Sequence, residues 1–282
     1  MDKIVRTAYG AELIQRQLRK IPFLARPNTT LNQKLGILKE AAVPTGEYPV
    51  VNYLAIGNQG HTFEMDGSGV ATLLNKQHLA THAAPFGMTP FVLRPVTDDL
   101  TPAQRERYAL RKEIQVGQQW YAAYYLRRLD PSSNDVLAEY RKTVDGVTTS
   151  RPFVPDASSL DPVPSTINFD DANVVLGESI SYVTETPFIM TSDDVQEYLS
   201  ACNLLYGSEN KAIISDMAIC SGYDYTTTVS SVNGGSFQFT ESICTQVFTF
   251  MSCFHALAYN RLGLTTTLGL VSDSPLFMID AT

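Results

Sequence analysis

The spacing of apolar residues predicts two amphipathic helices. Residues 10–20 form the first of them, and Pro22 ends it. The second begins at Thr191 or Ser192, because either side chain can accept a backbone N–H of the first turn, and it ends at Gly207. Its buried stripe is predicted to consist of Val195, Tyr198, Leu199, Cys202 and Leu205.

A capping pattern predicts a third helix. Thr101 can cap it, Pro102 suits its first position, where no N–H is needed, and Gln104 completes a capping box. We expect this helix to run to about residue 111. Three arginines would then face water or a partner: Arg105, Arg107 and Arg111.

Alternation of apolar and polar residues predicts strands in much of the remaining chain. Residues 48–57 and 114–129 are rich in β-formers. Asp145-Gly146 is a two-residue turn signal in a hairpin of residues 137–154. Further strands are predicted at 173–191, 212–220, 223–232 and 236–253. The predicted fold class is α+β, mixed and strand-rich, with a few short helices and an extended N-terminal arm.

The order of these elements suggests four consecutive regions. The N-terminal helical arm either lies on a neighbouring subunit or folds back on its own domain, and the sequence leaves both alternatives open. A segment rich in proline, serine and aspartate connects the two larger regions. The regions are a helical arm at 1–47, a mixed α/β region at 48–154, a linker at 155–172 and a strand-rich region at 173–282.

Charge is divided unevenly along the chain. The net charge is −8, but residues 1–142 carry +5 and residues 143–282 carry −13. One interpretation is ordinary surface solvation, and the other is a polarised subunit whose basic face meets an acidic face of a neighbour. The acidic balance and the lack of a basic, aromatic motif argue against nucleic-acid binding. No apolar run reaches the roughly 18 residues of a membrane span, so no membrane partner is expected.

The positions of the cysteines and histidines indicate structural residues and not a metal site or a reactive site. The four cysteines form no C-x-x-C pair and lie in apolar contexts, which favours buried free thiols and synthesis in a reducing cytoplasm. If residues 71–79 are helical, His78 and His82 lie one turn apart, a spacing that can bind metal with a third ligand such as His61 or Asp66. We expect instead a structural pair of histidines, and therefore neither a metal site nor a cofactor.

Sequence motifs give no support for catalysis. The chain has no G-x-S-x-G elbow, no H-E-x-x-H and no Walker pattern, and its glycine-containing loops at 57–60 and 66–69 lack the context of a phosphate cradle. The interpretation is that the protein is not an enzyme. The alternative is a soluble hydrolase or small-ligand-binding protein whose site is assembled from distant residues.

Residues 50–112 resemble a known class of proteins. The carrying segments are VVNYLAIGNQGH, from Val50, and THAAPFGMTPFVLRPVTDDLTPAQRERYALRK, from Thr81. They are similar to virion structural proteins of contractile-tailed bacteriophages, in the style of baseplate-wedge or tail-associated subunits. The resemblance implies a virion subunit of the tail, made in the host cytoplasm. It also implies no catalytic residues, and binding to baseplate, tail-tube or neck proteins and to copies of itself around a symmetry axis.

The expected contact surface combines the basic helix with an aromatic strand. Tyrosine and tryptophan are common at protein interfaces, although a sheet with a tyrosine-rich polar face is the alternative. Replacing the three arginines by glutamate is expected to block incorporation into a particle and to leave the isolated fold intact. The predicted interface residues are Arg105, Arg107, Arg111, Trp120, Tyr121, Tyr124 and Tyr125.

Overall fold

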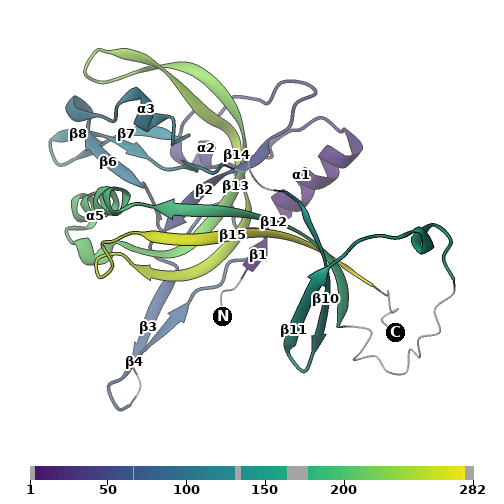
Figure 1. Ribbon diagram of the computed structural model, residues 1–282. Coiled ribbons are helices and arrows are strands. Elements are labelled where there is room, and N and C mark those ends of the chain that lie inside the picture. The colour runs from purple at the N-terminus through teal and green to yellow at the C-terminus, as the bar shows by residue number, and fades with distance from the viewer. Residues whose placement is uncertain (1–3, 66, 131–134, 164–176, 277–282) are drawn as a thin grey trace. The chain divides into compact units, whose positions relative to one another are not determined.

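A computed structural model describes residues 4–65, 67–130, 135–163 and 177–276. The chain divides into two compact units, one of residues 1–129 and 189–265 and the other of residues 130–188 and 266–282. These units interleave in the sequence, unlike the four consecutive regions predicted, because strands distant in sequence pair with each other. The described strands form four antiparallel sheets accompanied by a few short helices, which confirms the strand-rich α+β prediction (Figure 1).

The first unit is built on a sheet dominated by one long hairpin. Residues 213–230 form a single strand, where the sequence predicted two, because register shifts near Cys220 and Ser221 let pairing continue past the break in pattern. The turn contains Gly234 at φ 83°. In spatial order the strands are β1 (Ile4–Arg6), β14 (Ser236–Ala256), β13 (Ile213–Ser230), β2 (Val50–Gly57) and β5 (Met88–Thr89), and β9 (Arg127–Arg128) also pairs with β2.

A three-stranded sheet packs against this hairpin through the main core. Its order is β6 (Val92–Pro95), β8 (Gln119–Tyr124) and β7 (Arg111–Val116). The core contains Tyr121 and Ala123 of β8 together with apolar residues of β2, β13 and β14. The predicted helix from Thr101 is real, with its capping box, but α3 (Pro102–Arg105) is only one turn long. The predicted extent to residue 111 is wrong, because residues from Arg111 onward pair with β8.

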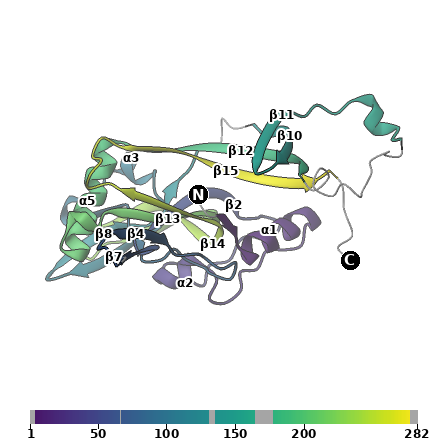
Figure 2. The same ribbon diagram turned by 90° about the horizontal axis from the view of Figure 1, so that it is seen from below.

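Three helices complete the first unit's described structure beside α3. Thr7 caps α1 (Ala8–Arg19), while capping boxes start α2 (Leu31–Leu35) and α5 (Ser192–Tyr206). The predicted helices at 10–20 and 192–206 are thus confirmed, including the end at Gly207. Both α1 and α2 contact β14, so the N-terminal segment folds back on its own unit (Figure 2). None of the described helices has the length and apolar character needed to cross a membrane.

A two-stranded ribbon projects from the first unit (Figure 1). It consists of β3 (His61–Met65) and β4 (Ala71–Asn75), paired in register from His61↔Asn75 to Met65↔Ala71. The predicted helix at 71–79 is therefore wrong, because residues 71–75 complete a hairpin. Asp66, considered as a metal ligand, lies outside the described residues.

The second unit holds most of a four-stranded sheet. The hairpin around Asp145-Gly146 is confirmed, and both turn residues have positive φ. Parts of the predicted linker and of the predicted strand at 173–191 fall at 164–176, outside the described residues. The sheet order is β11 (Val147–Pro152), β10 (Leu137–Val144), β12 (Glu178–Met190) and β15 (Leu264–Pro275). Short 3₁₀ turns are η1 (Val96–Asp98) and η3 (Glu209–Lys211) in the first unit and η2 (Ala157–Leu160) in the second.

Candidate functional site

The seven predicted contact residues do not form one surface. Trp120 is 40% exposed, and Arg105 and Arg107 are half-buried. On β8 the residues Tyr121 to Tyr124 are buried on both faces of the strand, whereas Trp120, near its start, is exposed. Four of the seven residues are buried in the described structure and offer little surface to a partner: Arg111, Tyr121, Tyr124 and Tyr125. Their place at or near an interface stays a prediction.

Arg111 instead organises a buried polar network. Its guanidinium donates to Asp99 at 2.9 Å and to Glu113 at 2.8 Å. The Tyr124 hydroxyl also donates to Asp99, at 2.7 Å. Burial opposes ionisation of Glu113, but hydrogen bonds from Val232 N–H and Arg111 lower the pKa of this carboxyl below its ordinary value. The network fixes the hairpin β7–β8 to residues before α3.

Inside each unit, basic residues of the first half of the chain form ion pairs with acidic residues of the second half. In the first unit, Arg107 donates to both oxygens of Asp194 at 2.7 and 2.8 Å. Burial opposes ionisation of Asp194, but Arg127 and Arg107 hold the pKa of its carboxyl below its ordinary value. The Arg107–Asp194 pair joins a basic residue of the first half of the chain to an acid of the second half. The other arginine and lysine pairs of this kind are Arg127–Asp194, Arg94–Glu197 and Arg128–Asp224 in the first unit and Lys142–Glu178 in the second.

Glu241 should make stability depend on pH. It is buried on β14 and accepts from the Arg111 backbone N–H at 3.2 Å. Burial raises its pKa to about 8 from 4.5, although the Arg111 N–H and the charges of Arg111 and Arg128 oppose the rise. A raised acid pKa means that the folded state binds more protons, so the free energy of unfolding falls as pH rises from about 4.5 to about 8.

Glu241→Gln is expected to remove this pH dependence. The amide keeps the shape and the acceptor but stays neutral. The gain in unfolding free energy over the parent should therefore grow between pH 5 and pH 9, to an upper bound of about 4 kcal/mol. Urea unfolding at several pH values measures it. The exposed Glu106→Gln is the matched control, and parallel curves for Glu241→Gln and the parent would contradict the expectation.

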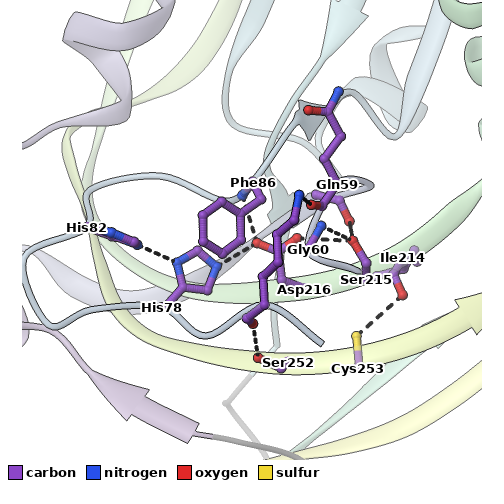
Figure 3. A network of polar contacts seen from close by, with 12 residues as sticks. Gln59, Gly60, His78, His82, Phe86, Ile214, Ser215, Asp216, Ser252 and Cys253 are labelled. Carbon is purple, nitrogen blue, oxygen red and sulfur yellow. Dashed lines mark hydrogen bonds and ion pairs between the residues drawn. The ribbon is translucent and has the colours of Figure 1, made fainter. Parts of the chain in front are cut away.

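A buried histidine–carboxylate pair joins the loop that follows the ribbon to strand β13 (Figure 3). His78 Nε2 lies 2.8 Å from Asp216 Oδ2, and both side chains are 1% exposed. The same oxygen accepts the Phe86 N–H at 2.9 Å. The imidazole is stacked between Phe86 and Phe250, at centroid distances of 4.0 and 3.7 Å. The loop at 76–90 is thereby fastened to strand β13.

His82 extends the pair towards the surface. Its Nδ1 lies 3.1 Å from His78 Nδ1, so the two histidines do meet, although through a loop rather than a helix. Burial and the neighbouring His78 lower the pKa of His82. Among the described residues, no group of three His, Cys, Asp or Glu side chains is arranged to hold a metal ion. The expected structural pair of histidines agrees with this geometry.

Ser215 lies beside this pair and binds the loop between β2 and β3. Its hydroxyl lies 3.1 Å from the Gly57 carbonyl and 3.5 Å from Asp216 Oδ1, either of which can accept its proton, and it accepts the Gly60 N–H at 2.7 Å. Gly57 faces Asp216 so closely that a Cβ there would overlap its carboxylate and the Phe86 carbonyl. These contacts pack the β2–β3 loop closely against β13. The hydrolase alternative stays a prediction.

The ribbon exposes an apolar face. Phe63 pairs with Leu73, and Met65 pairs with Ala71, so these side chains share one face. Phe63 is 55% exposed and Met65 is 67% exposed. The opposite face carries Glu64 and Thr72, together with Thr62 and Leu74. The sequence signal was present: alternation at 61–65, the glycines at 67 and 69, and a second apolar segment at 71–74 are typical of a hairpin.

The apolar face ends in a basic pocket. The pocket has a volume of about 670 Å³, and Phe63 and His61, both on the apolar face, line it. Lys76 and Lys211 line it as well. Burial lowers the pKa of His61, and the charges of Lys76 and Lys211 lower it further. The pocket was not predictable from the sequence, because its lining residues come from three separate segments.

The predicted state of the cysteines is confirmed, because all four are free and buried.

The chain matches one family model. The model of a family described as "Family of unknown function (DUF7208)" matches residues 1–282. No curated protein and no solved structure matches the chain.

Proposed function

The chain belongs to the DUF7208 family, whose function is unknown, and we propose that it is a structural subunit of a bacteriophage particle. In this proposal it lies in the baseplate or another part of the tail and acts through contacts with other virion proteins and with copies of itself. The resemblance of residues 50–112 to tail-associated virion proteins supports the phage context. The apolar face of the β3–β4 ribbon supports a function in assembly.

The exposed apolar face is the observation that carries the proposal. An isolated two-stranded hairpin is marginally stable in water, and a third strand or a covering surface stabilises it. The ribbon holds Phe63, Met65 and Leu73 together on one side, each at least 36% exposed. Contiguous exposed apolar side chains rimmed by polar residues mark interaction surfaces. A partner that covers this face would bury those side chains and hold the ribbon in place.

Location in the particle tests the proposed function. Mass spectrometry of purified tails from the source phage, together with immunogold electron microscopy, should find the chain in the tail. Gold at the tail tip supports the baseplate position, and gold at the head–tail junction moves the subunit to the neck. Absence from particles by both methods overturns the proposal, since mass spectrometry also detects a subunit whose epitope is buried.

Met65→Asp is expected to block incorporation without unfolding the chain. Met65 is mostly exposed, so the substitution should change the free energy of unfolding by less than about 1 kcal/mol. A charge on the covered face should lower incorporation at least about tenfold, which corresponds to about 1.4 kcal/mol of contact energy. Particles assembled with the variant are assayed by mass spectrometry.

Thr62→Asp provides the matched control. It introduces the same residue on the same ribbon but on the opposite face. Normal incorporation of Thr62→Asp and loss of Met65→Asp would locate the contact on the apolar face. Equal incorporation of both variants would show that this face is not a contact, even if the chain is found in the tail.

A further inference from the structure

The basic pocket beside the ribbon lacks any acidic lining residue. Its nine lining residues include two lysines, Lys76 and Lys211, and a histidine, His61, but no aspartate or glutamate. Among the described residues, neither lysine lies within 4.0 Å of a carboxylate, whereas Arg94, Arg107 and Arg128 are all paired with acids. Two positive charges are therefore available to a ligand.

The pocket's polar groups are positioned by the fold. Lys76 Nζ donates to the Gln59 carbonyl at 2.8 Å, which holds the ammonium group beside the β2–β3 loop. Asn58, which is 8% exposed, donates from Nδ2 to the Lys211 carbonyl at 3.4 Å. Two buried atoms of lining residues, Asn58 Oδ1 and His61 Nδ1, have no hydrogen-bond partner within the described structure. Asn58 Oδ1 only accepts and cannot bind a carboxylate, whereas His61 Nδ1 can donate to one in the tautomer that carries its proton there. Unpaired buried polar atoms are uncommon in folded proteins and call for a reason.

Backbone geometry argues against phosphate as the ligand. Phosphate sites rely on several backbone N–H groups that point at the anion. In the β2–β3 loop those groups are occupied. Asn58 N–H donates to Gly87 O, Gln59 N–H donates to Phe86 O, and Gly60 N–H donates to Ser215 Oγ. What the pocket offers instead is two point charges on side chains, which suit separate carboxylates.

We propose that the pocket binds carboxylate side chains of an extended partner segment whose apolar residues cover the β3–β4 ribbon. The inference rests on the proposed function, since it describes the partner of the same surface. Phe63 lies in both parts, so one segment can span the apolar face and the basic pocket. Because successive side chains of an extended segment point to opposite faces, the partner is a polypeptide whose apolar residues on the ribbon are followed along the segment by acidic residues that reach Lys76 and Lys211.

Binding of small carboxylates to the isolated full-length chain tests the pocket. In two-dimensional NMR, glutarate should shift the His61, Lys76 and Lys211 signals saturably, with a dissociation constant on the order of 1–10 mM. Lys76→Gln combined with Lys211→Gln should weaken this binding at least about tenfold. Lys39→Gln, at a lysine that is 61% exposed in the same unit, is the matched control and should bind as the parent does.

Two further probes identify the ligand. An eight-residue peptide of four valines followed by four aspartates should bind more tightly than glutarate and should also shift the Met65 signals. Shifts at His61 without shifts at Met65 would overturn the joint surface. Inorganic phosphate binding more tightly than glutarate would overturn the choice of carboxylate, and no saturable shift with glutarate would overturn the pocket.

The pocket and the proposed function can fail separately. Glutarate binding by a chain that is absent from phage particles would overturn the proposed function and keep the carboxylate pocket. A chain present in tails that binds no glutarate would overturn the pocket and keep the structural function. The glutamine variants should also keep the melting temperature of the parent, because both lysines are exposed. A large loss of stability would contradict their assignment to a binding surface.

Discussion

Arg111→Glu should prevent the isolated chain from folding stably. The Arg111 side chain is 2% exposed and lies between Asp99 and Glu113. A glutamate there would bring a third carboxylate against them and would leave both without a cation. Removing one partner of a buried ion pair typically costs about 3–5 kcal/mol, and reversing its charge costs more. Since a whole domain is stable by only about 5–15 kcal/mol, most of the stability should be lost.

Urea unfolding followed by circular dichroism measures this effect. The control is Arg19→Glu, which reverses the charge of an exposed arginine at the end of α1 and should cost less than about 1 kcal/mol. The expected result corrects the sequence-based expectation that replacing three arginines would leave the fold intact. A stably folded Arg111→Glu chain that fails only in assembly would contradict the buried network.

Asp216→Leu should be nearly as damaging. The carboxylate accepts from His78 Nε2 and from the Phe86 N–H, and nothing else in the described contacts replaces it. Leucine would leave both donors buried without an acceptor, at a cost of about 3–5 kcal/mol. The loop at 76–90 should loosen first, because this pair fastens it to β13. Hydrogen exchange of the Phe86 N–H, together with urea unfolding, measures both consequences.

A double substitution separates the pair from the packing. In His78→Phe combined with Asp216→Leu, an apolar ring can occupy the space between Phe86 and Phe250, and no donor on residue 78 lacks a partner. The double variant should be less destabilised than the sum of the two single variants by at least about 1 kcal/mol. Asp98→Asn, at a carboxylate that is 81% exposed, should cost under about 1 kcal/mol. Additive effects in the cycle would mean that His78 and Asp216 are not coupled.

Local rules predicted the elements whose signals lie within a few residues. The caps at Thr101 and Thr191 and the turn at Asp145-Gly146 appear as expected, because each depends on neighbouring backbone groups. The same rules gave the wrong length for the helix after Thr101, which ends at Arg105 and not near residue 111. Residues 111–116 pair with β8 as strand β7, because strand pairing overrides a local helical tendency.

The candidate site was less predictable than the fold. The contact prediction relied on residue types, and arginine and tyrosine are equally suited to an interface and to a hydrogen-bonded interior. Tyr124 on β8 and Arg111 on the neighbouring β7 both lie inside, and Asp99 supplies an acceptor to both. The ribbon could have been read from the alternation of His61, Phe63 and Met65. The basic pocket could not, because Lys76 and Lys211 are far apart in sequence.

The sequence by itself determined the strand-rich class, the helix starts, the free buried thiols and the uneven charge, since all of these follow from composition or short-range pattern. Only the tertiary structure decided which charged residues pair with each other. Arg107 meets Asp194, and His78 meets Asp216, because pairing of distant strands brings the basic half of the chain against the acidic half. It also decided which apolar residues are left uncovered. Side-chain burial depends on the neighbours that a strand acquires in space, and those neighbours are not its neighbours in sequence.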